Sequence, residues 1–332
     1  MSVPKVVYFN VDGGLDFERD LLRRWGVADQ LELAEAQAPA ATDADFVAAL
    51  AGAQGAVVEY FEVTEAVLDA LPELRVVALQ SIGYSNVDVA AATRRHVAVT
   101  NSPGFCTEEV ALHTVGLLID LVRKISFFDR SVRAGHWDPL LGPMPQRIGG
   151  QRVGLVFFGS IPQRMTPMLQ AIGLEVAVYA PTKTEEFLAP FGVTKVETLD
   201  ELLATSDFVS LHTPLLPETR GLIGVRELAL MKPTAFLLNT ARGQVVDEAA
   251  LVAALMAGRI AGAGVDVIAD EDAERSDLIG LDNTVVTPHS AFVSEQSFAM
   301  AREIALRQLV ETLVLGQVPT NLVNRELRKS AE

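Results

Sequence analysis

The sequence predicts an α/β protein with two doubly wound, Rossmann-like parallel sheets. Three observations lead to this class. Short β-branched runs alternate with longer helical patterns from the first residues onward, as in stacked parallel βα units. Two such series are separated by a loose stretch, residues 135–150, that is rich in glycine and proline. The length of 332 residues, 49% hydrophobic and 21% charged, suits about two globular domains.

The first series occupies the first hundred residues. Strands are expected at 5–10, 55–59, 75–80 and 97–100, with helices such as 65–70 and 87–95 between them. A long helix is then expected from 107 to about 133. Thr107 is its predicted N-cap, and Glu108 and Glu109 favour the positive helix end.

The second series begins after the loose stretch and forms a larger sheet. Its strands are expected at 152–158, 175–179, 208–212, 235–239, 262–267 and 284–287. An amphipathic helix over 294–315 closes the chain. Periodicity alone does not decide which domain this helix joins.

Charge and cysteine content exclude several classes of protein. The net charge of −16 repels phosphate backbones and anionic lipid, so neither a nucleic-acid partner nor a membrane is expected. The one cysteine, Cys106, cannot form an internal disulfide, and the start of the chain lacks a signal-peptide layout. The apolar segment near 110–122 is too short for a membrane span. We therefore expect a cytoplasmic protein.

The turn after the first strand of the second series is the candidate dinucleotide site. Its glycine pattern is altered, because Phe157 and Pro162 stand where a G-x-G-x-x-G motif has glycine and only Gly159 remains. The amides of Ser160 and Ile161 are still free to meet a phosphate. From the sequence, Phe157 can either crowd a cofactor or point into the core, and an ordinary βα turn stays an open alternative.

The next strand ends without the acidic residue that binds an adenosine ribose in NAD-preferring sites. Thr182 and Lys183 follow it and can hold a 2′-phosphate, so NADP is slightly favoured over NAD. A solvated surface lysine is the alternative for Lys183.

Acid–base chemistry directs attention to histidines at strand ends. His212 and His289 both end predicted strands, where wound sheets bind ligands, and position alone does not rank them. Arg242 follows another strand and can grip a carboxylate, and Glu271 lies in an acidic stretch. Each residue taken alone is also compatible with a structural role. No ligand spacing suggests a metal.

Taken together in order, several segments resemble the D-isomer-specific 2-hydroxyacid dehydrogenase family over nearly the whole chain. The segments are Gly83-Tyr84-Ser85-Asn86-Val87-Asp88, Asn101-Ser102-Pro103-Gly104, Leu211-His212-Thr213-Pro214-Leu215, Leu238-Asn239-Thr240-Ala241-Arg242-Gly243, Gly264-Val265-Asp266-Val267 and Thr287-Pro288-His289. The stretch from Phe105 to Val110 is more similar to the branch related to C-terminal-binding proteins.

The resemblance implies roles for individual residues. It places the catalytic arginine, glutamate and proton-transferring histidine on Arg242, Glu271 and His289. It implies that the amides of Ile82 and Gly83 hold the substrate carboxylate. Tyr84 is a further candidate for lining the substrate pocket, and core packing is its alternative. The cofactor residues, from the turns above and from the resemblance, are Val110, Gly159, Ser160, Ile161, Thr182, Lys183, His212, Thr213, Pro214, Thr240, Ala241 and Asp266.

The same resemblance implies domain boundaries and a reaction. A flavodoxin-like substrate domain is expected from residues 1–103 and 292–332, and an NAD(P)-binding Rossmann domain from 104–291. The expected reaction is hydride transfer between nicotinamide and a 2-oxo or D-2-hydroxy acid, in a homodimer joined through the long helix beginning at Thr107. The competing hypothesis, motivated by Phe157, Pro162 and Ala180, is a catalytically silent dinucleotide sensor or protein-binding module.

Overall fold

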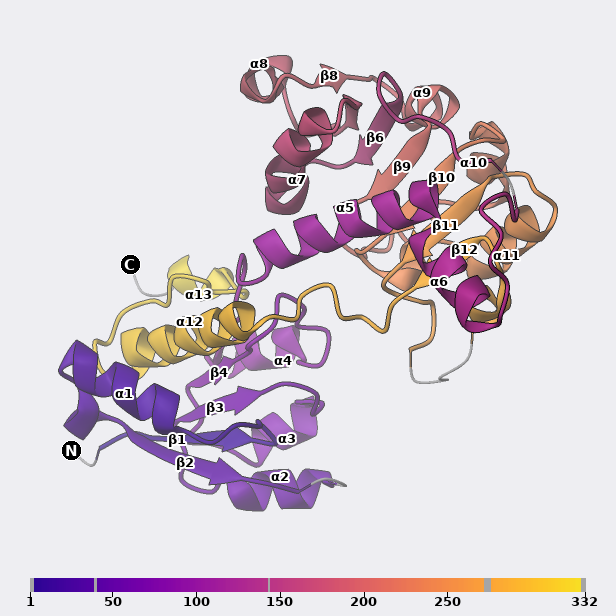
Figure 1. Ribbon diagram of the computed structural model, residues 1–332. Coiled ribbons are helices and arrows are strands. Elements are labelled where there is room, and N and C mark those ends of the chain that lie inside the picture. The colour runs from indigo at the N-terminus through magenta and orange to yellow at the C-terminus, as the bar shows by residue number, and fades with distance from the viewer. Residues whose placement is uncertain (1–2, 39–40, 143, 272–275, 330–332) are drawn as a thin grey trace. The chain divides into compact units, whose positions relative to one another are not determined.

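The computed structural model of the protein describes residues 3–38, 41–142, 144–271 and 276–329 (Figure 1). The chain divides into two compact units. Unit 1 comprises Met1–Phe105 and Ser294–Glu332, and unit 2 comprises Cys106–Val293. Among the described residues, no helix combines the length and apolar character that crossing a membrane requires.

Unit 1 is a five-stranded parallel sheet in the order β2-β1-β3-β4-β5. This order matches the flavodoxin-like winding. The strands are β1 (Lys5–Phe9), β2 (Glu32–Ala36), β3 (Gly55–Val58), β4 (Val76–Ala78) and β5 (Ala98–Thr100). The helices are α1 (Asp16–Trp25), α2 (Asp43–Ala49), α3 (Glu65–Asp69), α4 (Val89–Arg94), α12 (Glu295–Leu313) and α13 (Glu326–Lys329).

Two apolar layers cover the sheet of unit 1. One joins Phe9, Val58 and Leu79 to buried residues of α2, α3 and α4, and the other joins Tyr8 and Val57 to α1 and α12. The closing helix therefore returns to the first sheet, which periodicity did not decide. Ser294 caps α12 by accepting from the amide of Ser297 at 2.8 Å.

Unit 2 is a seven-stranded parallel sheet in the order β12-β11-β10-β9-β6-β7-β8, the Rossmann winding with one added strand. Its strands are β6 (Arg152–Val156), β7 (Glu175–Tyr179), β8 (Thr194–Lys195), β9 (Phe208–Leu211), β10 (Phe236–Asn239), β11 (Gly262–Val265) and β12 (Thr284–Val286). Its helices are α5 (Thr107–Arg123), α6 (Ile125–Arg133), α7 (Ser160–Ala171), α8 (Glu185–Leu188), α9 (Leu199–Thr205), α10 (Val225–Leu230) and α11 (Glu248–Met256). The predicted fold class of two wound parallel sheets is confirmed.

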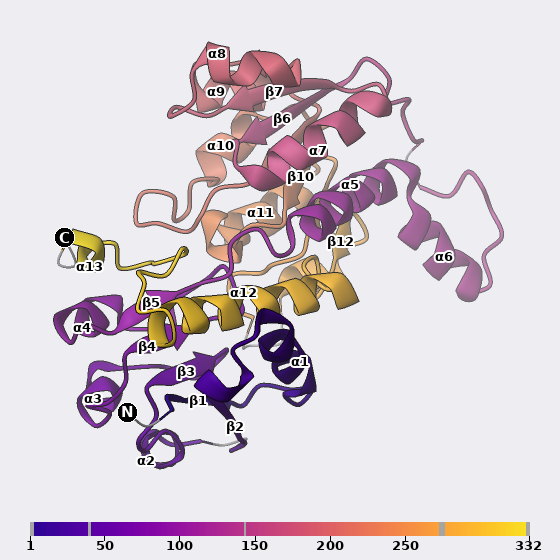
Figure 2. The ribbon, with the colours of Figure 1, turned by 90° about the vertical axis from the view of Figure 1, so that its left-hand side faces the viewer.

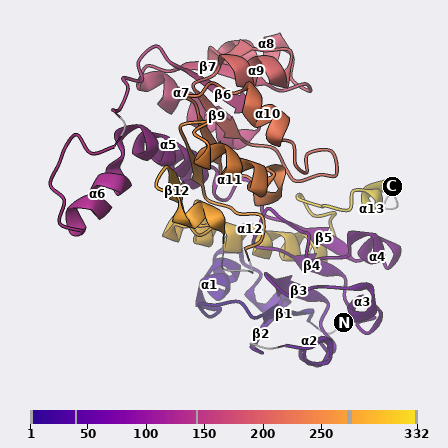
Figure 3. The ribbon, with the colours of Figure 1, turned by 90° about the vertical axis from the view of Figure 1, so that its right-hand side faces the viewer.

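Helices cover both faces of this second sheet. Buried residues of α5 and α7 form one apolar layer, and those of α9, α10 and α11 form the other. In Figures 2 and 3, α6 and the loop after it stand away from the sheet of unit 2. The strands thus end together at one edge, where the loops that carry the candidate site begin.

Two local predictions are wrong. The long helix expected over 107–133 breaks at Lys124, whose φ of 55° is left-handed, so α5 and α6 are separate helices. Thr107 is the first residue of α5, and its N-cap is Cys106, which makes no capping bond through its side chain. The turn of the chain at Lys124 is what directs α6 away from the sheet.

Candidate active site

A histidine and a glutamate form a hydrogen-bonded pair at the carboxyl edge of unit 2. His289 Nδ1 and Glu271 Oε2 lie 2.8 Å apart, and both side chains are about two-fifths exposed. The bond to Glu271 assigns the hydrogen on Nδ1 and leaves Nε2 for exchange with a bound molecule. His289 itself has a φ of 50°, a left-handed backbone that sets the direction of its ring.

Buried Asp266 fixes the loop that carries His289. It follows β11, and its carboxylate accepts from the amides of Ser290 and Ala291, each at 2.9 Å. Its carbonyl accepts from the His289 amide at 2.7 Å. These bonds hold the backbone of His289 and of the two residues after it, so Asp266 positions the histidine.

Helix α5 supports the same loop through a short relay. Thr287 Oγ1 donates to Asp266 at 2.5 Å, and His113 Nε2 lies 2.9 Å from that hydroxyl. Because the hydroxyl hydrogen of Thr287 is directed to Asp266, His113 is the donor toward Thr287. This role of His113 was not predicted, since a histidine within a helix gives no signal of a contact 174 residues away.

Arg242 lies after β10, the strand next to β11. Its own carbonyl accepts from the Asn239 side chain at 2.9 Å, and its guanidinium is half-buried and donates to the Ala241 carbonyl at 2.6 Å. The neighbouring Thr240 hydroxyl lies 2.8 Å from that of Thr114 on α5. Hydrogen bonds therefore hold the loop at Thr240 and at the Arg242 carbonyl.

A close backbone approach joins the Arg242 loop to the segment leading to Glu271. A Cβ placed on Gly243 would lie 1.8 Å from the Ile268 carbonyl oxygen, so only glycine fits there. The Gln244 side chain donates to the Ala269 carbonyl at 2.7 Å, and Glu248 accepts from the Ala269 amide at 2.7 Å. In the sequence, Gly243 stands out only as part of a motif, and nothing there indicates its close contact with the Ile268 backbone.

The turn from β6 into α7 keeps the features that a dinucleotide needs. Phe157 adopts a φ of 69°, a left-handed conformation that glycine adopts most readily, and its side chain packs against the core of unit 2. Gly159 caps α7 in open space, with no atom within 4 Å of the position that a Cβ would occupy. The amides of Ser160 and Ile161 begin the helix, and Pro162 takes a first-turn position that needs no donor. These residues fit a bound pyrophosphate.

Further predicted cofactor residues follow β7 and β9, the strands on either side of β6. Thr182 and Lys183 follow β7, and the Lys183 ammonium lies 4.4 Å from the centre of the Phe187 ring. His212, Thr213 and Pro214 follow β9. Burial lowers the pKa of His212 to about 3, and its Nε2 lies 2.9 Å from the Ser210 hydroxyl. His212 is therefore uncharged at neutral pH, and its imidazole does not take up a proton in the range where an acid–base catalyst would.

The predicted substrate-carboxylate residues Ile82, Gly83 and Tyr84 lie in unit 1, in the loop after β4. Ile82 and Tyr84 are partly exposed, at 37% and 45%. Val110, assigned to the nicotinamide, is buried near the start of α5 in unit 2. The predicted residues are thus distributed over both units, with Arg242, Glu271 and His289 together in unit 2.

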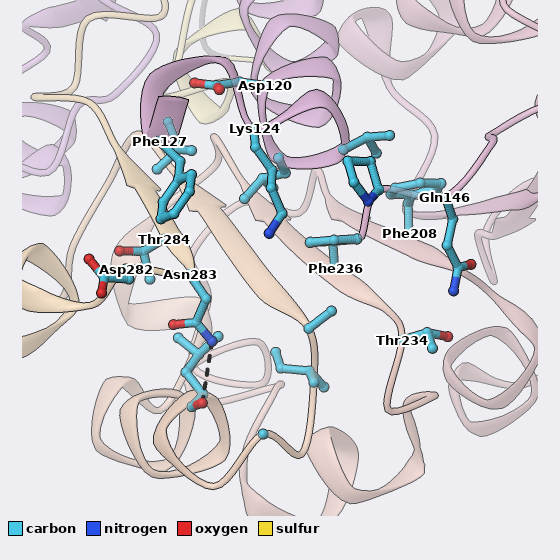
Figure 4. Close-up of a pocket in the computed structure, with 18 of the residues that line it drawn as sticks. Asp120, Lys124, Phe127, Gln146, Phe208, Thr234, Phe236, Asp282, Asn283 and Thr284 are labelled. Atoms are coloured by element: carbon cyan, nitrogen blue, oxygen red, sulfur yellow. Dashed lines mark hydrogen bonds between the residues drawn. The ribbon is translucent and has the colours of Figure 1, made fainter. Parts of the chain in front are cut away.

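A cavity of about 690 Å³ lies at the opposite, amino edge of the unit 2 sheet (Figure 4). Lys124 and Phe127 face Phe208 and Phe236 across it, and Asn283 lies at the start of β12. None of the predicted catalytic residues lines it. In the described segments, no group of three or more His, Cys, Asp or Glu side chains could hold a metal ion.

Comparisons with known proteins identify a family model and curated relatives. Residues 115–291 match the model of the D-isomer specific 2-hydroxyacid dehydrogenase NAD binding domain. The chain is 40% identical over 267 residues to a glyoxylate reductase of Korarchaeum cryptofilum, covering 79% of this chain and 80% of the relative. A glyoxylate reductase of Thermococcus litoralis is 36% identical, over 81% of this chain and 83% of the relative.

Solved structures give the same result over almost the full chain. A protein of Thermus thermophilus superimposes with a TM-score of 0.84 at 33% identity, covering 96% of this chain and 99% of that one. An NADPH-dependent glyoxylate/hydroxypyruvate reductase of Sinorhizobium meliloti superimposes with a TM-score of 0.84 at 28% identity, covering 97% of this chain and 98% of that one.

The two wound sheets and these matches define a nicotinamide-dependent oxidoreductase that uses NAD or NADP. The chain belongs to the D-isomer specific 2-hydroxyacid dehydrogenase family, whose substrates are 2-oxo and 2-hydroxy acids. The alternative of a catalytically silent module is not favoured, because relatives named as glyoxylate reductases match over most of the chain.

Proposed function

We propose that the protein is a cytoplasmic, NADPH-preferring reductase of small 2-oxo acids such as glyoxylate and hydroxypyruvate. The names of its relatives support this substrate class. The observation that carries the proposal is the 2.8 Å pair of His289 and Glu271, held at the sheet edge that also carries Arg242. A chain with one cysteine, buried at the start of α5, suits a reducing compartment.

Each group in the proposal has one task. Unit 1 binds substrate through the amides of Ile82 and Gly83, and unit 2 binds the dinucleotide. Arg242 binds the substrate carboxylate and carbonyl oxygen. His289 Nε2 gives its proton to that oxygen during reduction, and Glu271 stabilises the charged ring. The nicotinamide, when bound, supplies the hydride to C2.

Steady-state oxidation of NADPH with glyoxylate, hydroxypyruvate and pyruvate tests the proposal. We expect turnover with at least one of these acids and none with the same compounds lacking the 2-oxo group. Absence of turnover with every acid and with both nicotinamides would exclude the reductase function. Tight nucleotide binding without turnover would instead support a sensor.

The NADPH preference is proposed from the end of β7, where no acidic residue ends the strand and Thr182 and Lys183 follow it. A lysine attracts a 2′-phosphate, whereas an aspartate or glutamate repels it. The Lys183→Glu variant should lower kcat/KM with NADPH about tenfold or more and leave kcat/KM with NADH nearly unchanged. Equal effects on both nicotinamides would contradict the assignment.

We also propose a homodimer formed through α5 and the adjoining arm, residues 125–142. No residue of α6 is buried, and Trp137 of the following loop is 87% exposed. Exposed apolar surface of this kind marks interfaces. Residues 123–136 carry four basic and one acidic side chain in a chain of net charge −16, so this segment is attracted to a second copy.

Light scattering coupled to gel filtration tests the dimer. The wild-type chain should elute with about twice the monomer mass at micromolar concentration, and the double variant Trp137→Ser, Leu140→Ser should shift toward the monomer. Monomeric wild-type protein would contradict the proposal.

A further inference from the structure

In the loop after β4, a run of backbone carbonyls is hydrogen-bonded while the adjoining backbone amides, within the part of the chain that the structure describes, are not. Three successive carbonyls, of Ser81, Ile82 and Gly83, each accept a hydrogen bond within unit 1. In the described part of the chain, the amides of Ile82, Gly83 and Tyr84 donate to no acceptor. The loop therefore has its acceptors occupied and its donors available.

Three specific bonds produce this polarity. The Ser81 carbonyl accepts from the Ser102 amide at 2.9 Å. The Ile82 carbonyl accepts from the Asn101 side-chain amide at 2.8 Å. The Gly83 carbonyl accepts from the Ser81 hydroxyl at 2.8 Å. Two of the three bonds thus depend on side chains.

Peptide geometry converts these bonds into a direction for the amides. In a trans peptide the carbonyl and the following N–H point to opposite sides of the plane. The carbonyls of Ser81 and Ile82 both face the segment 101–102, so the N–H groups of Ile82 and Gly83 both point away from it. Neighbouring amides directed to one side attract an anion, as in backbone nests.

Asn101 is itself held firmly. It follows β5, and the chain end pairs with that strand through an antiparallel bridge between Thr100 and Leu322. Buried Asn324 accepts from the Val99 amide at 2.9 Å and donates to the Val97 carbonyl at 2.9 Å. The C-terminal segment therefore fixes the strand end from which Asn101 reaches the loop.

We infer that Asn101 and Ser81 are positioning residues that hold this loop with the Ile82 and Gly83 amides toward the substrate carboxylate. This inference rests on the proposed function, in which those amides bind the carboxylate. Neither side chain touches the reacting atoms. Losing one of them lets a carbonyl turn toward the anion, which weakens substrate binding and leaves the chemical step in unit 2 intact.

The test compares Asn101→Ala, Asn101→Leu and Ser81→Ala with a matched control. Gln54→Ala also removes a side-chain amide that donates to a backbone carbonyl in unit 1, but at the amino edge of the sheet. Each test variant should raise KM for glyoxylate about three- to tenfold, as expected for one hydrogen bond, with kcat changed less than about twofold. The affinity for NADPH should not change, and Gln54→Ala should keep the wild-type KM.

The outcomes separate this inference from the proposed function. An active wild-type enzyme with unchanged KM in all three variants would overturn the positioning role alone, as would equal losses in the Gln54→Ala control. If the Asn101 variants do not fold, the KM of the Ser81→Ala variant tests the positioning role. If the wild-type protein shows no turnover, calorimetric titration of oxamate into the NADPH complex gives the same comparison. Absence of oxamate binding as well would contradict both proposals.

Discussion

At the carboxyl edge of unit 2, the turn from β6 into α7 differs from the loops of Arg242, Glu271 and His289 in what it requires of its sequence. The turn from β6 into α7 departs from the glycine motif at Phe157 and Pro162, yet Phe157 has a left-handed backbone and Gly159 caps α7. The loops of Arg242, Glu271 and His289 carry the three side chains that the family resemblance assigns to catalysis, and a Cβ on Gly243 between them would overlap the Ile268 carbonyl. Backbone amides need only a backbone path, whereas acid–base chemistry needs particular side chains, and this contrast explains the difference.

The largest effect should come from His289. Asparagine tolerates the left-handed backbone at this position but cannot exchange a proton near neutral pH. His289→Asn should lower kcat about 10²- to 10⁴-fold, with NADPH affinity unchanged in a fluorescence titration. A variant with wild-type kcat would remove His289 from its assigned role.

Gly243→Ala should have the next largest effect. Its added Cβ would overlap the Ile268 carbonyl, so the Arg242 loop and the Glu271 segment must separate. Overpacking of this kind costs about 1–3 kcal/mol, which lowers Tm by about 3–10 °C. Thermal unfolding followed by circular dichroism measures it. Gly280→Ala, where no atom lies within 4 Å, should unfold at the wild-type temperature.

Acid should destabilise unit 2 through His212. Burial holds its pKa at about 3 in the folded protein, while the unfolded histidine titrates near 6.5. The unfolded state therefore binds more protons between these values, and stability falls as pH drops through that window. In the His212→Gln variant, the loss of unfolding free energy on acidification should be smaller by about 1–2 kcal/mol, a figure reduced to allow for the partial exposure of the His212 side chain.

Melting temperatures measured from pH 7 to pH 4.5 test the His212 prediction. His96→Asn, at an exposed histidine of unit 1, serves as the control. Its melting temperature should fall with pH as steeply as that of the wild-type protein. Identical slopes in the wild-type and His212→Gln proteins would show that this imidazole does not stay neutral in the fold.

Phe157→Gly should have the smallest effect. Glycine relieves the cost of a left-handed backbone, about 1 kcal/mol, but removes the packing of the ring against the core. The two changes nearly offset each other, so Tm should shift by less than about 4 °C. The NADPH dissociation constant should change less than about threefold. A tenfold tighter binding would show that the ring obstructs the nucleotide.

The sequence predicted the buried strands well, because β-branched runs such as those of β1, β6 and β7 are bounded by turns. Two edge strands were not predicted. Strand β2 is Glu32–Ala36, a charged and alanine-rich segment that pairs only with β1, and β8 has two residues. Edge strands bury little apolar surface, so they leave little trace in a hydrophobic pattern.

The candidate site shows a similar limit. Motif order led to Arg242, Glu271 and His289, and the fold brings the last two into contact. The support from His113, Gly243 and Asn101 depends on contacts between residues far apart in the chain. The direction of Phe157 and the break at Lys124 depend on packing and a backbone angle that composition does not encode.

Transfer of a labelled hydride tests the central claim most directly. The wild-type protein is incubated with hydroxypyruvate and NADPH that carries deuterium at both C4 positions, and the product is analysed by mass spectrometry and chiral chromatography. We expect one deuterium at C2 of a D-2-hydroxy acid. A product without deuterium at C2, or no product at all, would contradict the assigned reaction.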